Sequence, residues 1–276
     1  MFRTLCTMPP SHKGVALVTG AAQGIGRSIA IRLATESFDV VVNDVLASRE
    51  KLDAVVEEIR AMGRNVSQHI ADVSQEEQVK ELFAYTVGQY GALDVVVANA
   101  GVIGKPGISF HEVPLEEYER VMNINSRGTF LCYKYAGIHM ISQGRGGRII
   151  GASSVAGKQG IVPGPYCASK FAIRGLTQAA AIEFGAHGIT VNAYAPGCIE
   201  TPILRTQKNR VCDIFLLFRY IDELGRMPEE VADLVAFLAG KESAFITGAF
   251  IGCCFSMILR IVSGQTISIN GGTWFD

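Results

Sequence analysis

The chain has 276 residues, of which 49% are hydrophobic, and a formal net charge of −1. This length is sufficient for one large α/β domain. Because Lys and Arg are not in surplus, the chain lacks the electrostatic signature of proteins that bind nucleic acid or anionic membranes, and we expect neither partner.

Cysteine and histidine usage argues against a disulfide framework and a metal site. The seven Cys are scattered, odd in number and form no C-x-x-C pair, which indicates reduced thiols in a reducing, cytoplasmic compartment. The five His show no paired ligand spacing, so no metal is expected. Residues 1–13 are irregular and lack the apolar run of a secretory signal. We therefore expect a loose extension over 1–13 and a single domain over 14–276.

The first elements have the pattern of a nucleotide-binding turn. An apolar run over 15–19 has the length of a strand, and a helical pattern follows over 27–34. Glycines between them allow a tight turn close to a phosphate, and the helix N-terminus offers free N–H groups. A turn without a ligand is the alternative, but strand, glycines and helix together favour a dinucleotide. The expected binding residues of this turn are Gly20, Gln23, Gly24, Ile25 and Gly26.

A second predicted strand, over 40–44, ends in a carboxylate, Asp44. An acid at this distance from the glycine turn is placed to meet the adenosine ribose hydroxyls. It would repel a 2′-phosphate, and no Lys or Arg lies in the glycine turn or directly after Asp44. The sequence therefore favours NAD over NADP, and the alternative interpretation of Asp44 is a solvated loop carboxylate.

Strands and helices alternate along the rest of the chain, which predicts a parallel sheet with helices on both faces and a ligand at the carboxyl ends of its strands. Ser74 to Glu77 predict a capping box for the helix that follows. Further strands are predicted over 66–71, 93–98, 148–152, 189–195 and 267–269, and helices over 48–62, 76–89, 115–143 and 166–184. Asp72, Val73, Asn99, Ala100, Gly101, Pro196 and Gly197 follow predicted strand ends.

Tyr166 and Lys170 are four residues apart at the start of a predicted helix, so both side chains lie on one helical face. A phenol in water has a pKa near ~10 and is a poor base at neutral pH. A neighbouring ammonium favours the phenolate and lowers that pKa, which makes the pair a candidate general acid/base. Such a pair also occurs by chance, so its context decides.

That context resembles the short-chain dehydrogenase/reductase family, in its single-domain branch of roughly 250 residues. The motifs are Thr19-Gly20-x-x-x-Gly24-x-Gly26, Asn99-Ala100-Gly101, Asn125, Ser154, Tyr166-x-x-x-Lys170 and Pro196-Gly197. The resemblance implies a Rossmann-type, doubly wound parallel sheet of seven strands and hydride transfer with a nicotinamide cofactor.

The resemblance also implies roles for individual residues. Tyr166 would be the general acid/base, Lys170 would lower its pKa and hold the nicotinamide ribose, and Ser154 would bind the substrate oxygen. Asn125 would fix a water of the proton relay. Ser153 competes with Ser154, and Asn123 competes with Asn125. The implied cofactor contacts are Asp44 with the ribose, Asp72 and Val73 with the adenine, Asn99 with the neighbouring region, and Ile199 and Thr201 with the carboxamide.

Two apolar segments depart from the family pattern. Residues 209–220 stand where the family has a variable substrate lid. Residues 249–263 form the second apolar segment, and removing residues 249–264 would bring Thr247-Gly248 next to Gln265-Thr266. Joining those two pairs would restore a family-like sequence, so we interpret the second segment as an insert. Its apolar core is too short for a membrane helix.

The expected activity is NAD(H)-dependent interconversion of a secondary alcohol and a ketone. Residues 169–178 resemble those of acetoin/diacetyl reductases, and related branches act on sugar alcohols, 3-oxoacyl thioesters or cyclic ketones. The alternatives are a 3-oxoacyl carrier-protein reductase using NADPH and a nucleotide-binding protein without turnover. The two long helices occupy the place of the family's dimer contacts, so we expect a homodimer or homotetramer.

Overall fold

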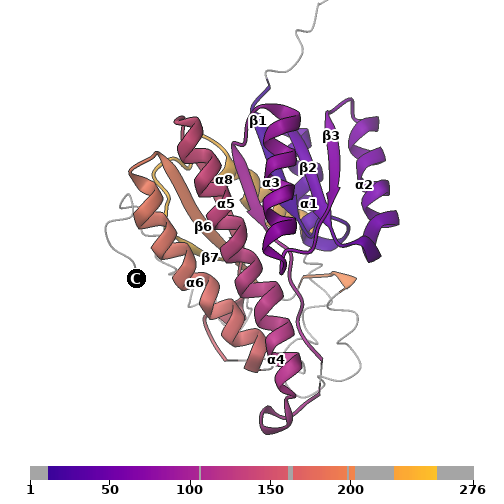
Figure 1. Ribbon diagram of the computed structural model, residues 1–276, viewed down its shortest axis with the longest axis vertical. Helices are drawn as coiled ribbons and strands as arrows, with labels where there is room; N and C mark the ends of the chain where they lie inside the picture. Colours follow the sequence, from indigo (N-terminus) through magenta and orange to yellow (C-terminus); the bar gives the residue numbers. More distant parts are fainter. Residues whose placement is uncertain (1–11, 106, 161–163, 198, 203–226, 254–276) are drawn as a thin grey trace, which may run out of the picture.

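The computed structural model describes residues 12–105, 107–160, 164–197, 199–202 and 227–253. In this part of the chain, seven parallel strands form one sheet in the order β3-β2-β1-β4-β5-β6-β7 (Figure 1). The order reverses between β1 and β4, which is the switch point where a ligand crevice opens in such sheets. The strands are β1 (Gly14–Thr19), β2 (Phe38–Asp44), β3 (Val66–Ile70), β4 (Val95–Ala98), β5 (Gly147–Ala152), β6 (Ile189–Pro196) and β7 (Phe250–Cys253).

Helices cover both faces of this sheet, so the predicted doubly wound architecture is confirmed. One buried cluster joins the sheet to α1 (Gly24–Thr35), α2 (Arg49–Ala61) and α8 (Pro228–Ala239). A second cluster joins the opposite face to α3 (Glu76–Tyr90), α5 (Gly128–Gln143) and α6 (Gly164–Gly185), which lie in front of the sheet in Figure 1.

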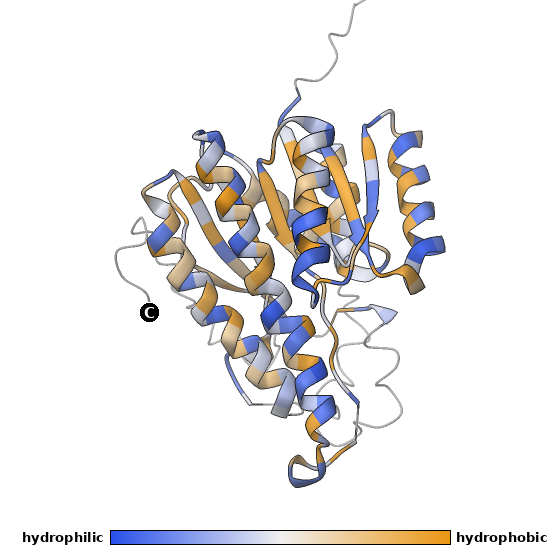
Figure 2. Ribbon diagram, in the orientation of Figure 1, coloured by the Kyte–Doolittle hydropathy of each residue, from blue (hydrophilic) through white to orange (hydrophobic). Residues whose placement is uncertain are grey.

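The central strands are apolar on both faces because both faces are covered. In β1, Ala16 and Val18 belong to one cluster and Leu17 to the other, and all three are fully buried. Figure 2 shows mainly hydrophobic residues in the central strands, whereas the edge strand β3 and the helices also carry hydrophilic residues. Alternation of side chains across a strand therefore supplies two separate cores.

The helix predicted over 115–143 is continuous but is not α-helical throughout. It consists of α4 (Leu115–Met122), a π-helical turn over Asn123–Arg127, and α5. Short π-helical turns occur often at functional sites. Asn125 lies inside this turn and is fully buried.

The capping box predicted at Ser74 to Glu77 is wrong. The N-cap of α3 is Gln75, and no side-chain hydrogen bond caps the helix. The Ser74 hydroxyl instead accepts a hydrogen bond from the Gln75 side-chain amide at 3.1 Å.

The last strand of the sheet comes from an unexpected part of the sequence. Phe250–Cys253 pair in parallel with β6, with Ala193 opposite Phe250. These four residues belong to the segment that the sequence interpretation treats as an insert. The strand predicted over 267–269 and the apolar segment 209–220 lie outside the described residues. Within the described ranges, no helix has both the length and the apolar character needed to cross a membrane.

Candidate active site

A cleft of about 910 Å³ lies at the carboxyl ends of the strands, at the switch point between β1 and β4. The sequence assigns nineteen residues to catalysis or cofactor binding, and all of them except Asn125 line this cleft. The lining residues among them are Gly20, Gln23, Gly24, Ile25, Gly26, Asp44, Asp72, Val73, Asn99, Ala100, Gly101, Ser154, Tyr166, Lys170, Pro196, Gly197, Ile199 and Thr201.

The glycine turn between β1 and α1 depends on the absence of side chains. Gly20 has φ 64° and Gly24 has φ 57°, a left-handed conformation that favours glycine. A Cβ on Gly20 would lie 2.8 Å from the Ala100 Cα atom. A Cβ on Gly26 would collide with the Gly20 carbonyl oxygen and the Asn99 side chain. The turn therefore packs directly against the end of β4 and leaves the N-terminus of α1 facing the cleft.

Asn99 supports this turn from below. Its Nδ2 donates to the carbonyl oxygens of Thr19 and Gly20, at 2.9 Å and 3.1 Å. Its Oδ1 accepts a 2.8 Å hydrogen bond from the Tyr194 hydroxyl. The Asn99 amide is thus bound to the protein on both sides and fixes the position of the glycine turn. Tyr194 was not predicted from the sequence, because its partner is 95 residues away.

Asp44, at the end of β2, lines the cleft beside the glycine turn. Its Oδ2 accepts from the Ala22 N–H at 3.1 Å and its Oδ1 accepts from the Val45 N–H at 2.9 Å. These bonds fix the carboxylate beside the glycine turn. Lys51, which was not predicted, also lines the cleft and donates to Gln23 Oε1 at 2.8 Å.

The Tyr166 and Lys170 side chains project from the first turns of α6 into the cleft. The Lys170 ammonium lies 5.5 Å from the centroid of the Tyr166 ring. Lys170 is only 4% exposed, and its Nζ donates to the Ala152 carbonyl oxygen at 2.7 Å. Burial lowers the pKa of Lys170 to about 8, because a low-dielectric surrounding disfavours the charged form.

The two candidate serines at the end of β5 have different surroundings, although both line the cleft. The Ser153 hydroxyl donates to the Lys170 carbonyl oxygen at 2.9 Å and so ties β5 to α6. The Ser154 hydroxyl donates to the Pro196 carbonyl oxygen at a long 3.4 Å and accepts from the Ala156 N–H. The longer bond leaves the Ser154 hydroxyl freer than that of Ser153 to exchange partners.

Asn125 lies beneath the cleft and not on its surface. Its amide binds the backbone N–H and C=O of Val102, each at 2.8 Å, and its Nδ2 also donates to Ser169 Oγ at 3.0 Å. A Cβ on Gly101 would lie 3.2 Å from Asn125 Oδ1 and 3.4 Å from Lys170 Nζ, so all three residues meet there. Asn123 is exposed.

Several lining residues have no signal in the sequence. Ser48 and Lys51 border the Asp44 region, and the segment Val102–Lys105 extends from Gly101 along the cleft. Ile124 and Arg120 reach the cleft from the helix that contains Asn125. Only the Gly and Pro content of the loop after Gly101 could have pointed to this segment.

These features fit a nicotinamide dinucleotide. The cleft has the size of a small-molecule site. Gly20 and Gly26 let the turn pack directly against Asn99 and Ala100, and the α1 N-terminus provides N–H groups for a phosphate. The Asp44 carboxylate is held where a ribose diol can donate to it.

Comparisons with known proteins give a consistent answer. A family model described as short chain dehydrogenase matches residues 14–211. A short-chain dehydrogenase/reductase of Armillaria gallica is 46% identical, covering 96% of this chain and 98% of its own length. The 3-oxoacyl-[acyl-carrier-protein] reductase of Staphylococcus aureus is 38% identical over 94% of this chain and 97% of its own. The crystal structure of levodione reductase matches with a TM-score of 0.80 at 31% identity, covering 88% and 96% of the two chains.

A glycine turn at the switch point of a parallel sheet, facing the same cleft as a Tyr–Lys pair, is the architecture of an oxidoreductase that uses a dinucleotide. The chain belongs to the short-chain dehydrogenase/reductase family, whose members are oxidoreductases that use NAD or NADP. The family resemblance stated from the motifs is confirmed.

Proposed function

We propose that the protein is an NAD(H)-dependent oxidoreductase that interconverts a secondary alcohol and a ketone. The observation that carries this proposal is the convergence of Tyr166, Lys170 and Ser154 on one cleft with the glycine turn. When bound, the nicotinamide cofactor supplies or accepts the hydride that is exchanged with the substrate carbon.

The chain's own groups handle the proton and the substrate oxygen. Tyr166 gives its hydroxyl proton to the oxygen during reduction and takes it back during oxidation. Lys170 places a positive charge 5.5 Å from the Tyr166 ring, which favours the phenolate. Ser154 donates a hydrogen bond to the same oxygen and thereby fixes its position.

Asn125 takes part through the backbone that it fixes. By binding Val102 and Ser169, Asn125 positions the part of the cleft lining at Val102 next to Lys170. We propose that a water held in this region passes the proton of Lys170 to solvent. Asp72, Val73, Pro196, Gly197, Ile199 and Thr201 would contact the cofactor along the cleft.

NAD is proposed over NADP because of Asp44. A carboxylate fixed by two backbone N–H groups cannot turn away from a 2′-phosphate without losing both bonds. Lys51 lies at the same end of the cleft and would offset part of this repulsion. The preference is therefore a balance between one fixed anion and one flexible cation.

A 3-oxoacyl carrier-protein reductase using NADPH is the second candidate, supported by the 38% identity to the Staphylococcus aureus enzyme of that name. Acetoin/diacetyl-type and sugar-alcohol substrates remain within the first proposal. A panel that separates small ketones from thioesters contains diacetyl, acetoin, levodione and acetoacetyl-CoA as a thioester probe.

The test is oxidation of NADH and of NADPH with each member of the panel, alongside a titration of cofactor binding. Oxidation of NADH by a ketone, abolished in Tyr166→Phe, is the expected result. Tight NADH binding without turnover of any carbonyl would instead indicate a nucleotide-binding protein without catalysis. Preference for NADPH and acetoacetyl-CoA would favour the second candidate.

We further propose a homodimer or homotetramer that uses α5 and α6, which pack side by side (Figure 1). Both helices carry exposed large apolar side chains, a feature of protein interfaces. These are Phe130, Ile138, Phe171 and Ile182. A monomer by light scattering would contradict this proposal.

A further inference from the structure

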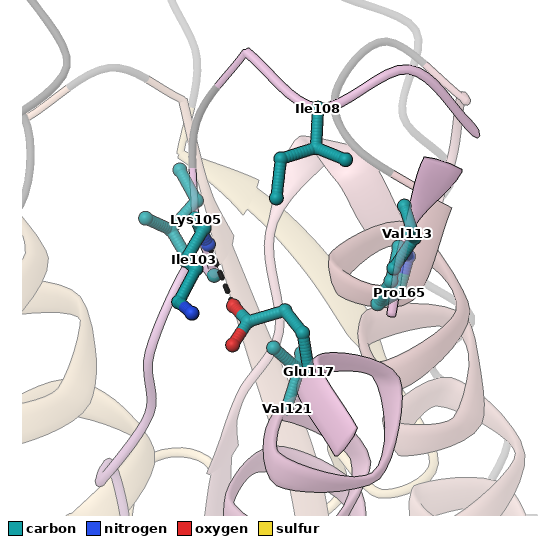
Figure 3. Close-up of a pocket in the computed structure, with 8 residues that line it drawn as sticks. Ile103, Lys105, Ile108, Val113, Glu117, Val121 and Pro165 are labelled. Atoms are coloured by element: carbon teal, nitrogen blue, oxygen red, sulfur yellow. Dashed lines mark hydrogen bonds between the residues drawn. The ribbon is translucent and has the colours of Figure 1, made fainter. Parts of the chain in front are cut away.

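Glu117 is a buried carboxylate to which the proposed chemistry gives no role. It lies on α4, outside the large cleft, and is 6% exposed. Figure 3 shows its side chain pointing from the helix toward the backbone of Lys105, within a small pocket walled by Ile103, Ile108, Val113, Val121 and Pro165. A charge in such surroundings is costly unless it is fully paired.

Three hydrogen bonds pair this carboxylate. Arg120 donates from Nε to Oε2 and from Nη2 to Oε1, both at 2.9 Å, which is the two-bond fork of a strong Arg–carboxylate pair. The backbone N–H of Lys105 donates to Oε1 at 2.6 Å. The hydrogen bonds from Arg120 lower the pKa of Glu117, and the bond from the Lys105 N–H lowers it further. Together they outweigh burial, which raises the pKa, so the carboxylate stays ionised at neutral pH.

The loop is shaped to reach Glu117. Gly104 has φ 91°, a conformation that favours glycine. A Cβ at this position would lie 3.2 Å from Glu117 Oε1 and 3.3 Å from Val121 Cγ2. Glycine therefore lets the backbone approach the carboxylate closely enough for the Lys105 N–H bond.

The same loop is held at its other end by Asn125, through the Val102 N–H and C=O. Glu117 and Asn125 lie on one continuous helical stretch. Four consecutive loop residues, Val102 to Lys105, are thus fixed at both ends, and all four line the cleft together with Arg120. Pro165, next to Tyr166 in the chain, packs against the same pocket as Glu117.

We propose that Glu117 is a positioning residue for the carbonyl substrate, acting through the cleft wall Val102–Lys105. This inference rests on the proposed function, because it assigns that wall to substrate and not to the cofactor. The proposed cofactor contacts of the glycine turn, Asp44 and Asp72 come from other strands, and Asn99 is bound to the Thr19 and Gly20 carbonyl oxygens. Loss of Glu117 therefore displaces the wall Val102–Lys105 and leaves those contacts in place.

The test compares Glu117→Gln with Glu116→Gln, a matched change at the exposed neighbouring position. In Glu117→Gln, one amide N–H₂ faces the Arg120 guanidinium, so two donors meet and the fork is lost. We expect the KM for the carbonyl that the wild type reduces best to rise at least fivefold, with kcat and the NADH dissociation constant changed less than threefold. Glu116→Gln should match the wild type in all three.

Hydrogen exchange gives a readout that does not depend on turnover. Backbone amides in a peptide covering 102–105 should exchange at least tenfold faster in Glu117→Gln, and those of the glycine turn should be unchanged. If the wild type reduces no carbonyl, the proposed function fails. Hydrogen exchange then still tests whether Glu117 holds the loop Val102–Lys105 in place. The inference would be overturned if exchange and KM were both unchanged. It would also be overturned if the NADH dissociation constant rose as much as the KM for the carbonyl. Should Glu117→Gln not fold, Gly104→Ala provides a second test, because its added methyl group would push the loop away from the Glu117 carboxylate. It should likewise raise the KM for the carbonyl while kcat and the NADH dissociation constant change little.

Discussion

The side-chain amide of Asn125 binds both backbone polar groups of Val102, donating to its C=O and accepting from its N–H, each at 2.8 Å. Its remaining amide hydrogen goes to Ser169 Oγ, whose own hydroxyl donates to the Tyr166 carbonyl oxygen at 2.7 Å. One fully buried side chain thus connects the loop after β4 to the helix that carries Tyr166 and Lys170. No other residue type supplies two donors and an acceptor in this geometry, except the longer Gln.

Replacing Asn125 by Asp should therefore be costly although the side chains have the same shape. A carboxylate cannot donate to the Val102 carbonyl oxygen or to Ser169, and burying its charge is costly. We expect the free energy of unfolding to fall by about 2–4 kcal/mol and kcat to fall at least tenfold. Urea unfolding and steady-state kinetics measure both. Asn123→Asp, at an exposed position of the same π-helical turn, should change neither quantity.

The parts of the site that follow local rules were predictable. Gly20, Asp44, Asp72 and Asn99 each lie at the end of a predicted strand, and the ends of parallel strands converge in space. The spacing of Tyr166 and Lys170 fixed their common helical face before any tertiary contact was known. Sequence patterns and the family resemblance together therefore identified 18 of the 35 residues that line the cleft.

The rest depends on contacts between distant residues. Tyr194 reaches Asn99 across the sheet, and Glu117 meets a loop that passes back over its helix. Nothing in the local sequence of either residue indicates its partner. The position of β7 was not predicted for a different reason: Phe250–Cys253 has a strand-like composition, but the family pattern led to its interpretation as part of an insert.

Lys170 should make the protein less stable at neutral pH than it would be with an apolar side chain. Its folded-state pKa of about 8 lies below the usual value near ~10.4 of the unfolded chain. Between these two values the unfolded chain binds more protons, so the free energy of unfolding rises with pH across this window. Below it, the full cost of burying the ammonium is present, at most roughly 3 kcal/mol at about 1.4 per pKa unit.

Lys170→Met should accordingly raise the free energy of unfolding by about 1–3 kcal/mol at pH 7, because the lost bond to the Ala152 carbonyl offsets part of the gain. The difference should shrink toward zero as the pH approaches 10, measured by urea unfolding at several pH values. The variant should lose at least 100-fold in kcat/KM, and the kcat/KM of the wild type should decline as the pH rises through about 8. Lys80→Met, at an exposed position, is the control, and a pH-independent effect at position 170 would contradict the argument.

Asp44 should control cofactor choice. Asp44→Asn removes the charge with little change of shape, so the ratio of kcat/KM for NADPH over NADH should rise about tenfold or more. Asp72→Asn removes an equal charge from the same cleft and should leave the ratio unchanged. Adding Lys51→Gln to Asp44→Asn should reverse part of the gain, because it removes the cation at that end of the cleft. An unchanged ratio in Asp44→Asn would place the 2′ position elsewhere.

Gly26 should be irreplaceable for packing and not for backbone conformation. It is absent from the glycines with positive φ, yet a Cβ there would collide with the Gly20 carbonyl oxygen and the Asn99 amide. Gly26→Ala must push α1 away from the turn, and we expect a loss of about 1–3 kcal/mol together with at least tenfold weaker NADH binding. Gly88→Ala, in α3 where a Cβ meets open space, should instead stabilise the protein by about 0.5–1 kcal/mol and leave binding unchanged. Thermal unfolding and NADH fluorescence titration measure the two effects, and equal behaviour of the two variants would mean that the close contact of α1 with the turn is not required.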